Sequence, residues 1–166
     1  TSDHGDLAGD HWLGEKEYFY EPAIQVPFIV ADPDPAADAT RGSASAQFVE
    51  CIDVMPTVLQ ALALDPQAHR VEGRSLLALT RGSASDWRDC VFGQLDYAFR
   101  EARQFLGRAP DACQGFMVRD ARYKYLHWQG YAPQLFDLQE DPQEFHDRGT
   151  DPALQATRDA MQQRLL

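Results

Sequence analysis

The sequence predicts an α/β fold in two parts: the C-terminal part of a larger α/β sheet, then a small antiparallel β-sheet subdomain that ends in a helix. Three observations support this prediction. Residues 26–31 form an unbroken apolar run, which is typical of a strand covered on both faces. Four short segments after residue 89 carry the aromatic-rich, partly alternating pattern of antiparallel strands. From residue 151 onward, apolar side chains recur at helical spacing.

The first half is expected to run from a loop into this strand and then into a helix. Residues 3–20 are dense in aromatic side chains and predict a loop packed against a cleft. Prolines at 33 and 35 end the strand, because they fix φ and remove backbone donors. A helix is predicted from Asp53 to about Leu64, with Pro56 in its first turn, where the missing N–H costs little. The apolar side chains expected to face the core are Val54, Val58, Leu59, Leu62 and Ala63.

The second half is predicted to be a small sheet. A Gly-Ser-Ala-Ser stretch at 82–85 indicates a boundary, which gives predicted domains 1–82 and 83–166. Strands are expected at 90–95, 113–119, 122–128 and 135–138, with a tight hairpin between the middle two. The third strand is expected to be half-exposed because polar and apolar residues alternate in it. Residues 96–111 are long for a connection and predict a helix or a functional excursion. Asp151, followed by Pro152, is a good N-cap for the terminal helix.

The composition excludes some classes of function. The chain has 166 residues and a net charge of -11, which argues against nucleic-acid binding, because a phosphate backbone requires a basic surface. Cys51, Cys90 and Cys113 give an odd count without paired spacing, so we expect buried thiols in a reducing, cytoplasmic setting. The sequence shows neither a signal peptide nor an apolar run long enough for a bilayer, so no membrane contact is expected.

The chemistry-bearing residues cluster at the start of the chain. Asp3 and His4 offer a carboxylate and an imidazole to a divalent metal, although a bare Asp-His-Gly is also compatible with a simple capped turn. The dipeptide recurs at Asp10-His11, and Lys16 supplies a cation that could hold an anionic substrate. Such a pair normally follows a parallel strand, and that strand would lie before Thr1. We therefore expect the chain to be the C-terminal part of a larger protein.

Several blocks of sequence, in chain order, resemble sulfatases, and more closely the phosphonate monoester hydrolase branch of the alkaline phosphatase superfamily. Each block is weak alone, and the ordered set is specific. The blocks are TSDHGD at 1–6, GDH at 9–11, LGEK at 13–16, IQVPFIV at 24–30, DVMPTVL at 53–59, EGRSLL at 72–77, MVRDARYKY at 117–125 and LFDLQEDPQE at 135–144.

This resemblance implies an alkaline-phosphatase-like sheet sandwich, with residues 1–82 forming the C-terminal part of its catalytic α/β domain. It also implies a formylglycine nucleophile, made from the Cys or Ser of a C/S-x-P/A-x-R motif. None of the three cysteines fits that motif. The nucleophile is therefore expected upstream of Thr1, and this chain would supply only part of an active site and be inactive alone.

The resemblance assigns roles to four residues. Asp3 and His4 match a metal-ligand pair, for which Mn²⁺, Ca²⁺ or Mg²⁺ are the candidate ions. Lys16 matches the lysine that contacts the anionic oxygen of the substrate, so it is the predicted catalytic and substrate-binding residue. His11 is expected to support the site rather than to bind metal.

The implied function is hydrolysis of phosphonate monoesters, phosphodiesters or sulfate esters. The expected partners are a small anionic ester, the N-terminal remainder of the same protein and a second copy of the chain in a homo-oligomer. The stretches 94–100 and 130–136 favour the phosphonate side. The alternatives are an arylsulfatase, a phosphotransferase, or a non-catalytic assembly domain derived from the same fold.

Overall fold

The computed structural model describes residues 1–65 and 69–165. The chain divides into two compact units. The first unit contains Thr1–Asp3 and Pro27–Asp89, and the second contains His4–Val26 and Cys90–Leu166. The units differ from the predicted domains 1–82 and 83–166 in that the His4–Val26 segment groups with the later strands. The domain boundary in the whole protein stays a prediction.

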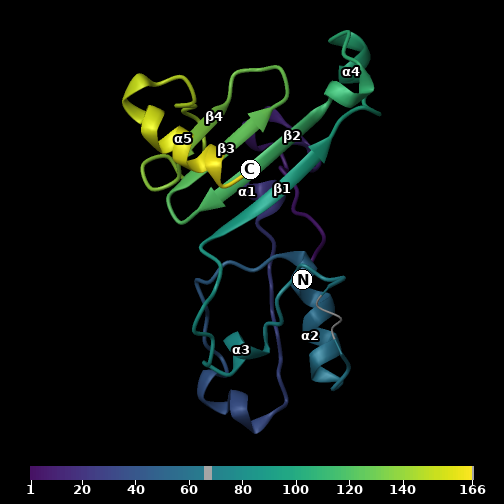
Figure 1. Ribbon diagram of the computed structural model, residues 1–166, viewed down its shortest axis with the longest axis vertical. Coiled ribbons are helices and arrows are strands. Elements are labelled where there is room, and N and C mark those ends of the chain that lie inside the picture. The colour runs from purple at the N-terminus through teal and green to yellow at the C-terminus, as the bar shows by residue number, and fades with distance from the viewer. Residues whose placement is uncertain (66–68, 166) are drawn as a thin grey trace. The chain divides into compact units, whose positions relative to one another are not determined.

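The second unit is built on a four-stranded antiparallel sheet (Figure 1). Its strands are β1 (Cys90–Asp96), β2 (Gln114–Asp120), β3 (Tyr123–Trp128) and β4 (Gln134–Asp137), in the order β1-β2-β3-β4. All four predicted strands are confirmed, as is the tight hairpin between β2 and β3. In that hairpin the Asp120 carboxylate accepts hydrogen bonds from the backbone N–H groups of Arg122 and Tyr123.

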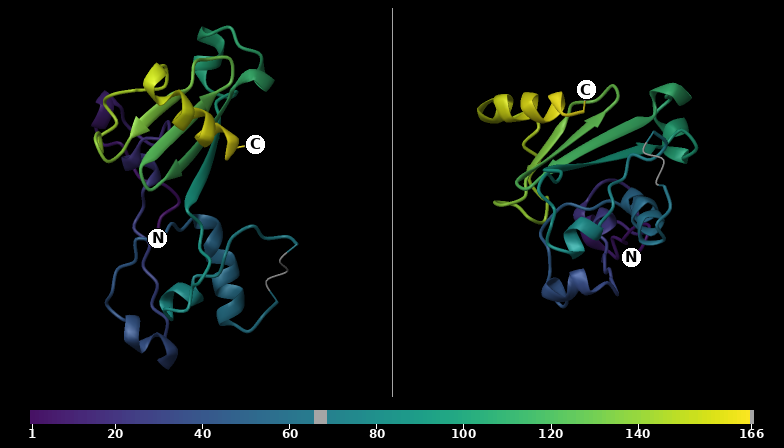
Figure 2. Two further views of the ribbon diagram at one scale, coloured as in Figure 1. Left: turned by 60° about the vertical axis from the view of Figure 1, so that its left-hand side comes forward. Right: turned by 60° about the horizontal axis from the view of Figure 1, so that its bottom comes forward.

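Both faces of this sheet are covered. On one face Met117, Leu126 and Phe136 pack with Phe19 of the His4–Val26 segment. The opposite face packs against Met161 of α5 (Gln155–Gln163). Figure 2 shows α5 and the purple N-terminal segment on opposite sides of the strands.

The prediction of a half-exposed third strand is therefore wrong. Lys124, Tyr125 and Leu126 are buried in succession, because alternate side chains of β3 meet the N-terminal segment and α5. The polar-apolar alternation in the sequence had suggested solvent on one side. In the structure the polar member of the pattern, Lys124, is as buried as its neighbours.

Shorter elements complete the second unit. The His4–Val26 segment contains η1 (Asp10–Trp12) and α1 (Glu21–Ile24). The long connection after β1 contains α4 (Glu101–Phe105) and η4 (Pro110–Ala112), so its expected helical content is confirmed. The terminal helix begins through η5 (Pro152–Leu154), where the Asp151 side chain accepts a hydrogen bond from Ala153 N, as its predicted N-cap role requires.

The first unit consists of η2 (Pro35–Thr40), η3 (Cys51–Asp53), α2 (Val54–Ala61) and α3 (Leu77–Thr80), joined by extended segments. The helix predicted from Asp53 is confirmed as η3 and α2. The strand predicted at 26–31 is wrong, because these described residues form no strand. An apolar run indicates burial, whereas a strand also needs a hydrogen-bonding neighbour, and the described part of the first unit contains no strand to pair with it.

The apolar side of α2 also differs from the prediction. Val54, Val58 and Leu62 were expected in the core and are 38%, 50% and 64% exposed. Within this chain, α2 contacts η3 and α3 but finds no sheet to cover that side among the described residues.

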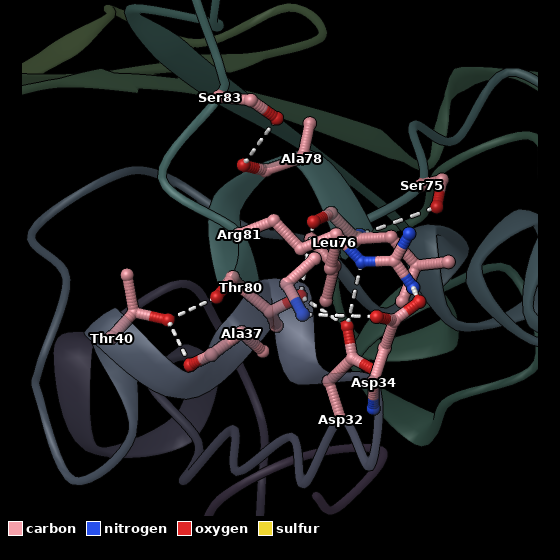
Figure 3. A network of polar contacts seen from close by, with 12 residues as sticks. Asp32, Asp34, Ala37, Thr40, Ser75, Leu76, Ala78, Thr80, Arg81 and Ser83 are labelled. Carbon is pink, nitrogen blue, oxygen red and sulfur yellow. Dashed lines mark hydrogen bonds and ion pairs between the residues drawn. The ribbon is translucent and has the colours of Figure 1, made fainter.

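Polar networks hold the first unit together. Asp53, fully buried, accepts two hydrogen bonds from Arg88 and one from the backbone of Arg74. A second network centres on Asp32, whose carboxylate accepts hydrogen bonds from the Thr80 hydroxyl and from Arg81 Nε, each at 3.0 Å (Figure 3). These two aspartates connect segments that are distant in the sequence.

The structure also tests the expectations about buried cysteines and about membrane-spanning segments. No disulfide joins Cys51, Cys90 and Cys113, all of which the structure describes. Cys113 is buried, as expected, but Cys51 is exposed. In residues 1–65 and 69–165, no helix is both long and apolar enough to cross a bilayer.

Candidate active site

Two of the predicted site residues, His11 and Lys16, lie in or directly after a closed loop formed by residues 7–15. Leu7 N donates to Glu15 O at 2.7 Å, and Gly9 N donates to Leu13 O at 2.9 Å. Leu7 is buried and anchors the base of the loop. This pairing brings the two ends of the loop together, so Lys16 directly follows its base, while His4 precedes Leu7 by three residues in the chain.

The loop has an unusual backbone. Five non-glycine residues in or next to it have positive φ: Ala8, His11, Trp12, Glu15 and Tyr18. Each such residue costs of order 1–3 kcal/mol, and strain of this kind concentrates at functional sites. The observation supports a functional reading of the loop independently of its sequence motif.

His4 is oriented by its neighbour. Its Nδ1 lies 2.6 Å from the carbonyl oxygen of Gly5, so Nδ1 carries the proton in that hydrogen bond. A neutral ring in this tautomer presents Nε2 as the metal-binding nitrogen, which is the usual arrangement of a ligating histidine.

Gly5 is needed here because two backbone segments approach each other closely. A Cβ at this position would lie 1.9 Å from the carbonyl oxygen of Pro22. The Gly5 N–H donates to Ala23 O at 2.8 Å, and Gly5 does not have positive φ. The residue after the predicted ligand pair is thus pressed against α1, which orients the chain at His4.

Asp3 is exposed and belongs to the first unit, whereas His4 belongs to the second. An Asp oxygen and a His nitrogen suit a divalent ion such as Mn²⁺. In the described residues, however, no group of three or more His, Cys, Asp or Glu side chains could hold a metal. The chain therefore offers a fitting pair of donors rather than a complete site, and their ligand role stays a prediction.

His11 and Lys16 have contrasting surroundings. The His11 ring stacks on Tyr20 with centroids 3.7 Å apart and an interplanar angle of 12°. It also lies 5.1 Å from the Phe145 ring, so its contacts are those of a packing residue, which agrees with the expected supporting role. Lys16 is exposed, as a residue that contacts substrate must be before substrate binds. The roles of both stay predictions.

Sequence reasoning missed a buried ion network beside these residues. Lys124, 0% exposed, places its ammonium 2.7 Å from Glu21 Oε1 and 2.6 Å from Glu144 Oε1. The same ammonium donates to the carbonyl oxygen of Phe19 at 2.8 Å. Arg119 donates twice to the Glu21 carboxylate. The alternation of β3 concealed Lys124, and only the placement of the N-terminal segment on the sheet reveals it.

The network affects titration in the segment. Burial alone would raise the pKa of Glu21, but the charges and hydrogen bonds of Lys124 and Arg119 outweigh it and hold that pKa below its ordinary value. Burial, followed by the negative charge of Glu144, raises the pKa of the neighbouring Tyr20. Glu21 therefore stays ionised and Tyr20 stays neutral at physiological pH.

The described part of the chain also has a shallow open depression beside α5, lined in part by Asp120, Tyr123 and Arg164. It carries none of the predicted site residues. It lies on the α5 side of the sheet, whereas the 7–15 loop belongs to the segment on the other side. The depression gives no reason to move the candidate site.

An antiparallel four-stranded sheet with a terminal helix on one face and a loop-bearing segment on the other is the C-terminal architecture of the sulfatase and phosphonate monoester hydrolase type. Comparison with known proteins makes this specific. The chain belongs to the family described as N-sulphoglucosamine sulphohydrolase, C-terminal, which matches residues 9–166.

Three relatives illustrate the similarity. The chain is 36% identical over 161 residues to the multifunctional alkaline phosphatase superfamily protein PehA of Trinickia caryophylli, covering 94% of this chain and 30% of that protein. It is 32% identical over 145 residues to an arylsulfatase of Clostridium perfringens, covering 87% of this chain and 27% of that protein. The crystal structure of the phosphonate monoester hydrolase of Agrobacterium radiobacter superposes with a TM-score of 0.89 at 32% identity, over 99% of this chain and 33% of that one.

These matches confirm the predicted family and fold class. They also set a limit, because the chain spans about a third of the length of the proteins it matches. The activity of a whole protein containing this chain is therefore a matter for proposal.

Proposed function

We propose that this chain is the C-terminal part of a metal-dependent hydrolase that acts on phosphonate monoesters, phosphodiesters or sulfate esters. The observation that carries the proposal is the strained, closed 7–15 loop, which Lys16 directly follows in the chain. The family membership of the chain supports the same class of reaction.

Each predicted residue has a distinct task in this proposal. Asp3 and His4 would hold a divalent ion together with donors from the rest of the protein. That ion, when bound, would polarise a non-bridging oxygen of the substrate. Lys16 would contact the anionic oxygen as a compact point charge and stabilise the charge that develops in the transition state. His11 would keep the loop in place by stacking on Tyr20.

The nucleophile would come from the remaining part of the protein. The family resemblance implies a formylglycine, formed from a Cys or Ser in a C/S-x-P/A-x-R motif. None of the cysteines in this sequence lies in such a motif. Among the candidate substrates we favour phosphonate esters, because a phosphonate monoester hydrolase superposes on this chain over nearly its whole length. An arylsulfatase is the second candidate, supported by the 32% identity to the Clostridium perfringens protein.

The proposal also covers the binding partners of the chain and its cellular location. The chain would associate with the N-terminal remainder of its own protein, form a homo-oligomer in the cytoplasm and bind a small anionic ester. The exposed aromatic residues Phe99 and Phe105 in the connection after β1, 75% and 92% exposed, suit a contact with a second copy. A non-catalytic assembly domain is the competing proposal from a different class.

Replacing Lys16 distinguishes the enzyme proposal from the assembly-domain proposal. In the full-length protein, Lys16→Ala is expected to lower kcat/KM for a phosphonate monoester by about 100-fold or more, the usual effect of removing one transition-state charge contact. Steady-state kinetics with an aryl phosphonate monoester and an aryl sulfate measure the fall in kcat/KM and the preference between the two substrates.

The matched control is Glu15→Gln, which changes an exposed neighbouring side chain that shares the loop backbone. Its turnover is expected to stay within about twofold of the parent, as for most surface changes. Turnover unchanged by Lys16→Ala would remove the proposed role of this lysine and favour the assembly domain.

A further inference from the structure

The buried network around Lys124 joins the sheet to the segment that bears the candidate site. Three oxygens lie within 2.8 Å of the Lys124 ammonium: the Phe19 carbonyl oxygen, which accepts a hydrogen bond, and carboxylate oxygens of Glu21 and Glu144, which form ion pairs. Two of these residues are in the His4–Val26 segment, and Lys124 itself is the second residue of β3. A single side chain therefore connects strand and segment.

The attachment is directed at the part of the segment that follows Lys16. Phe19 is held through its carbonyl oxygen by Lys124 and through its ring by the core of the sheet. Glu21 accepts from Arg119 and Lys124 through its carboxylate, and its backbone N–H donates to Glu144 Oε2 at 2.7 Å. Between these points and Lys16, Glu17 forms an ion pair with Arg100. The chain that leaves Lys16 is therefore held at several consecutive points.

Burying this network costs folding free energy, which indicates that it holds parts of the chain in position rather than adding stability. Lys124 and Glu144 are 0% and 1% exposed at their side chains, and burying such charges contributes little net stability compared with an apolar core. Glu144 also adopts a positive φ, which a non-glycine residue avoids unless the surroundings enforce it. An apolar residue at 124 could fill the space, but it could not bind a carbonyl oxygen and two carboxylates on separate parts of the chain.

Residues from two of the sequence blocks that resemble the family meet in this network. Arg119 and Lys124 lie in the block at 117–125, and Glu144 ends the block at 135–144. All three converge on Glu21 or its immediate neighbours. Neither block contains a residue predicted to touch substrate or metal.

We propose that Lys124, with Glu144, is a positioning residue that holds the chain at Phe19–Glu21 and thereby sets the position of Lys16 relative to the substrate. This inference rests on the proposed function of Lys16. Lys124 does not itself contact substrate. A small displacement of Lys16 would leave it near the substrate anion but misaligned with the charge of the transition state, so kcat should change more than KM.

The test uses the full-length enzyme carrying Lys124→Met together with Glu144→Gln. The pair removes one cation and one anion, so no buried charge is left without its opposite, and Gln can still accept from Glu21 N through its amide oxygen. The expected result is a fall in kcat of about 10-fold to 100-fold, as for other misplacements near 1 Å, with KM within about threefold.

The matched control is Arg122→Met. Arg122 lies in the hairpin that leads into Lys124 and donates to buried Asp137, so its loss disturbs the sheet. Its ion-pair partners, Asp137 and Glu140, both lie outside the His4–Val26 segment. Its kcat is expected to stay within about twofold of the parent once both proteins are assayed well below their melting temperatures. Equal falls in kcat for the control and for the double variant would overturn the proposal.

A second measurement separates positioning through Lys16 from general damage. On a Lys16→Ala background, the Lys124→Met/Glu144→Gln pair should lower kcat by no more than about twofold, because the group it positions is already absent. A fall as large as in the parent background would mean that the network acts on something other than Lys16. That outcome also contradicts the proposal.

Hydrogen exchange of the amides at 7–16 gives a readout independent of turnover. Exchange is expected to rise in the double variant and not in Arg122→Met, and unchanged exchange would contradict the positioning role. If Lys16→Ala has no effect on turnover, the proposed function fails. Hydrogen exchange would still test whether Lys124 and Glu144 hold the segment in place. If the double variant does not fold, Glu21→Gln, at the more exposed edge of the network, is subjected to the same two readouts and the same criteria.

Discussion

Two glycines show how the absence of a side chain lets backbone segments close on one another. Gly5 lies against Pro22 and Gly73 lies against Ile52, and neither has the positive φ that glycine often provides. A Cβ on Gly73 would lie 2.1 Å from the carbonyl oxygen of Ile52. The obstacle is backbone, which cannot rotate away as a side chain could, so Gly73 holds the turn before α3 against η3.

Gly73→Ala is therefore expected to destabilise the protein by about 3 kcal/mol, the upper range for inserting one methyl group into a packed site. Urea denaturation followed by circular dichroism measures the change. Gly14→Ala is the matched control, because nothing lies within 4 Å of the position where its Cβ would be. The control should range from unchanged to about 1 kcal/mol more stable, since alanine also restricts the unfolded chain. A neutral Gly73→Ala would show that the turn is free to move.

At the scale of elements, Asp32 connects the extended segment before η2 to the end of α3. The hydrogen bond from Arg81, assisted by those from the Asp34 backbone and the Thr80 hydroxyl, lowers the pKa of Asp32 from 3.8 to about 2. A carboxyl whose pKa is lowered on folding stabilises the folded state above its unfolded pKa. That contribution is lost as the pH falls from about 4 toward about 2.

Asp32→Asn should therefore lower the urea midpoint at pH 6, and the gap between variant and parent should narrow at pH 3. Denaturation curves at the two pH values measure this directly. The control is Asp38→Asn, whose partner Arg41 and whose own side chain are 46% and 67% exposed. That pair should contribute at most about 1 kcal/mol at either pH. A constant gap between Asp32→Asn and the parent would remove the titration argument.

The elements also show what periodicity can and cannot predict. The four strands of the sheet and the terminal helix were predictable because their patterns and turn residues are local properties of the chain. The strand at 26–31 was not, because pairing depends on a neighbour that the pattern does not report. Lys124 was missed for the related reason that an isolated lysine in an alternating strand normally faces water, and its burial depends on a segment more than 100 positions away.

At the scale of the molecule, the candidate site was predictable only in part. The motif residues Asp3, His4, His11 and Lys16 were recognisable from spacing and resemblance. The loop closure from Leu7 to Glu15, and the network that supports the segment, required coordinates because they depend on backbone bonds and on packing across the sheet. Sequence motifs thus provided the candidate residues, while the structure shows the contacts that hold the segment bearing His4, His11 and Lys16.

The two units differ in how their apolar residues are buried. Among the described residues, the buried apolar side chains of the first unit are Ala37, Pro56, Leu76 and Leu77, while the second unit holds both larger core clusters. Exposed apolar residues are instead common in the first unit, including Ile29, Met55 and Leu62 at 84%, 60% and 64% exposure. We expect a further segment of the whole protein to cover these exposed residues.

Hydrogen exchange of the 166-residue chain alone, compared with the full-length protein, should therefore separate the two units. In the isolated chain, amides of β2 and β3 are expected to stay protected, whereas those of α2 and of residues 27–31 exchange at least about 100-fold faster, because local opening free energies follow local burial. In the full-length protein the α2 amides should approach the protection of β2, and the β2 and β3 amides serve as the internal control. Equal protection of α2 in both forms would show that the first unit is complete without the remainder of the protein, which would weaken the proposal that this chain is one part of a larger catalytic domain.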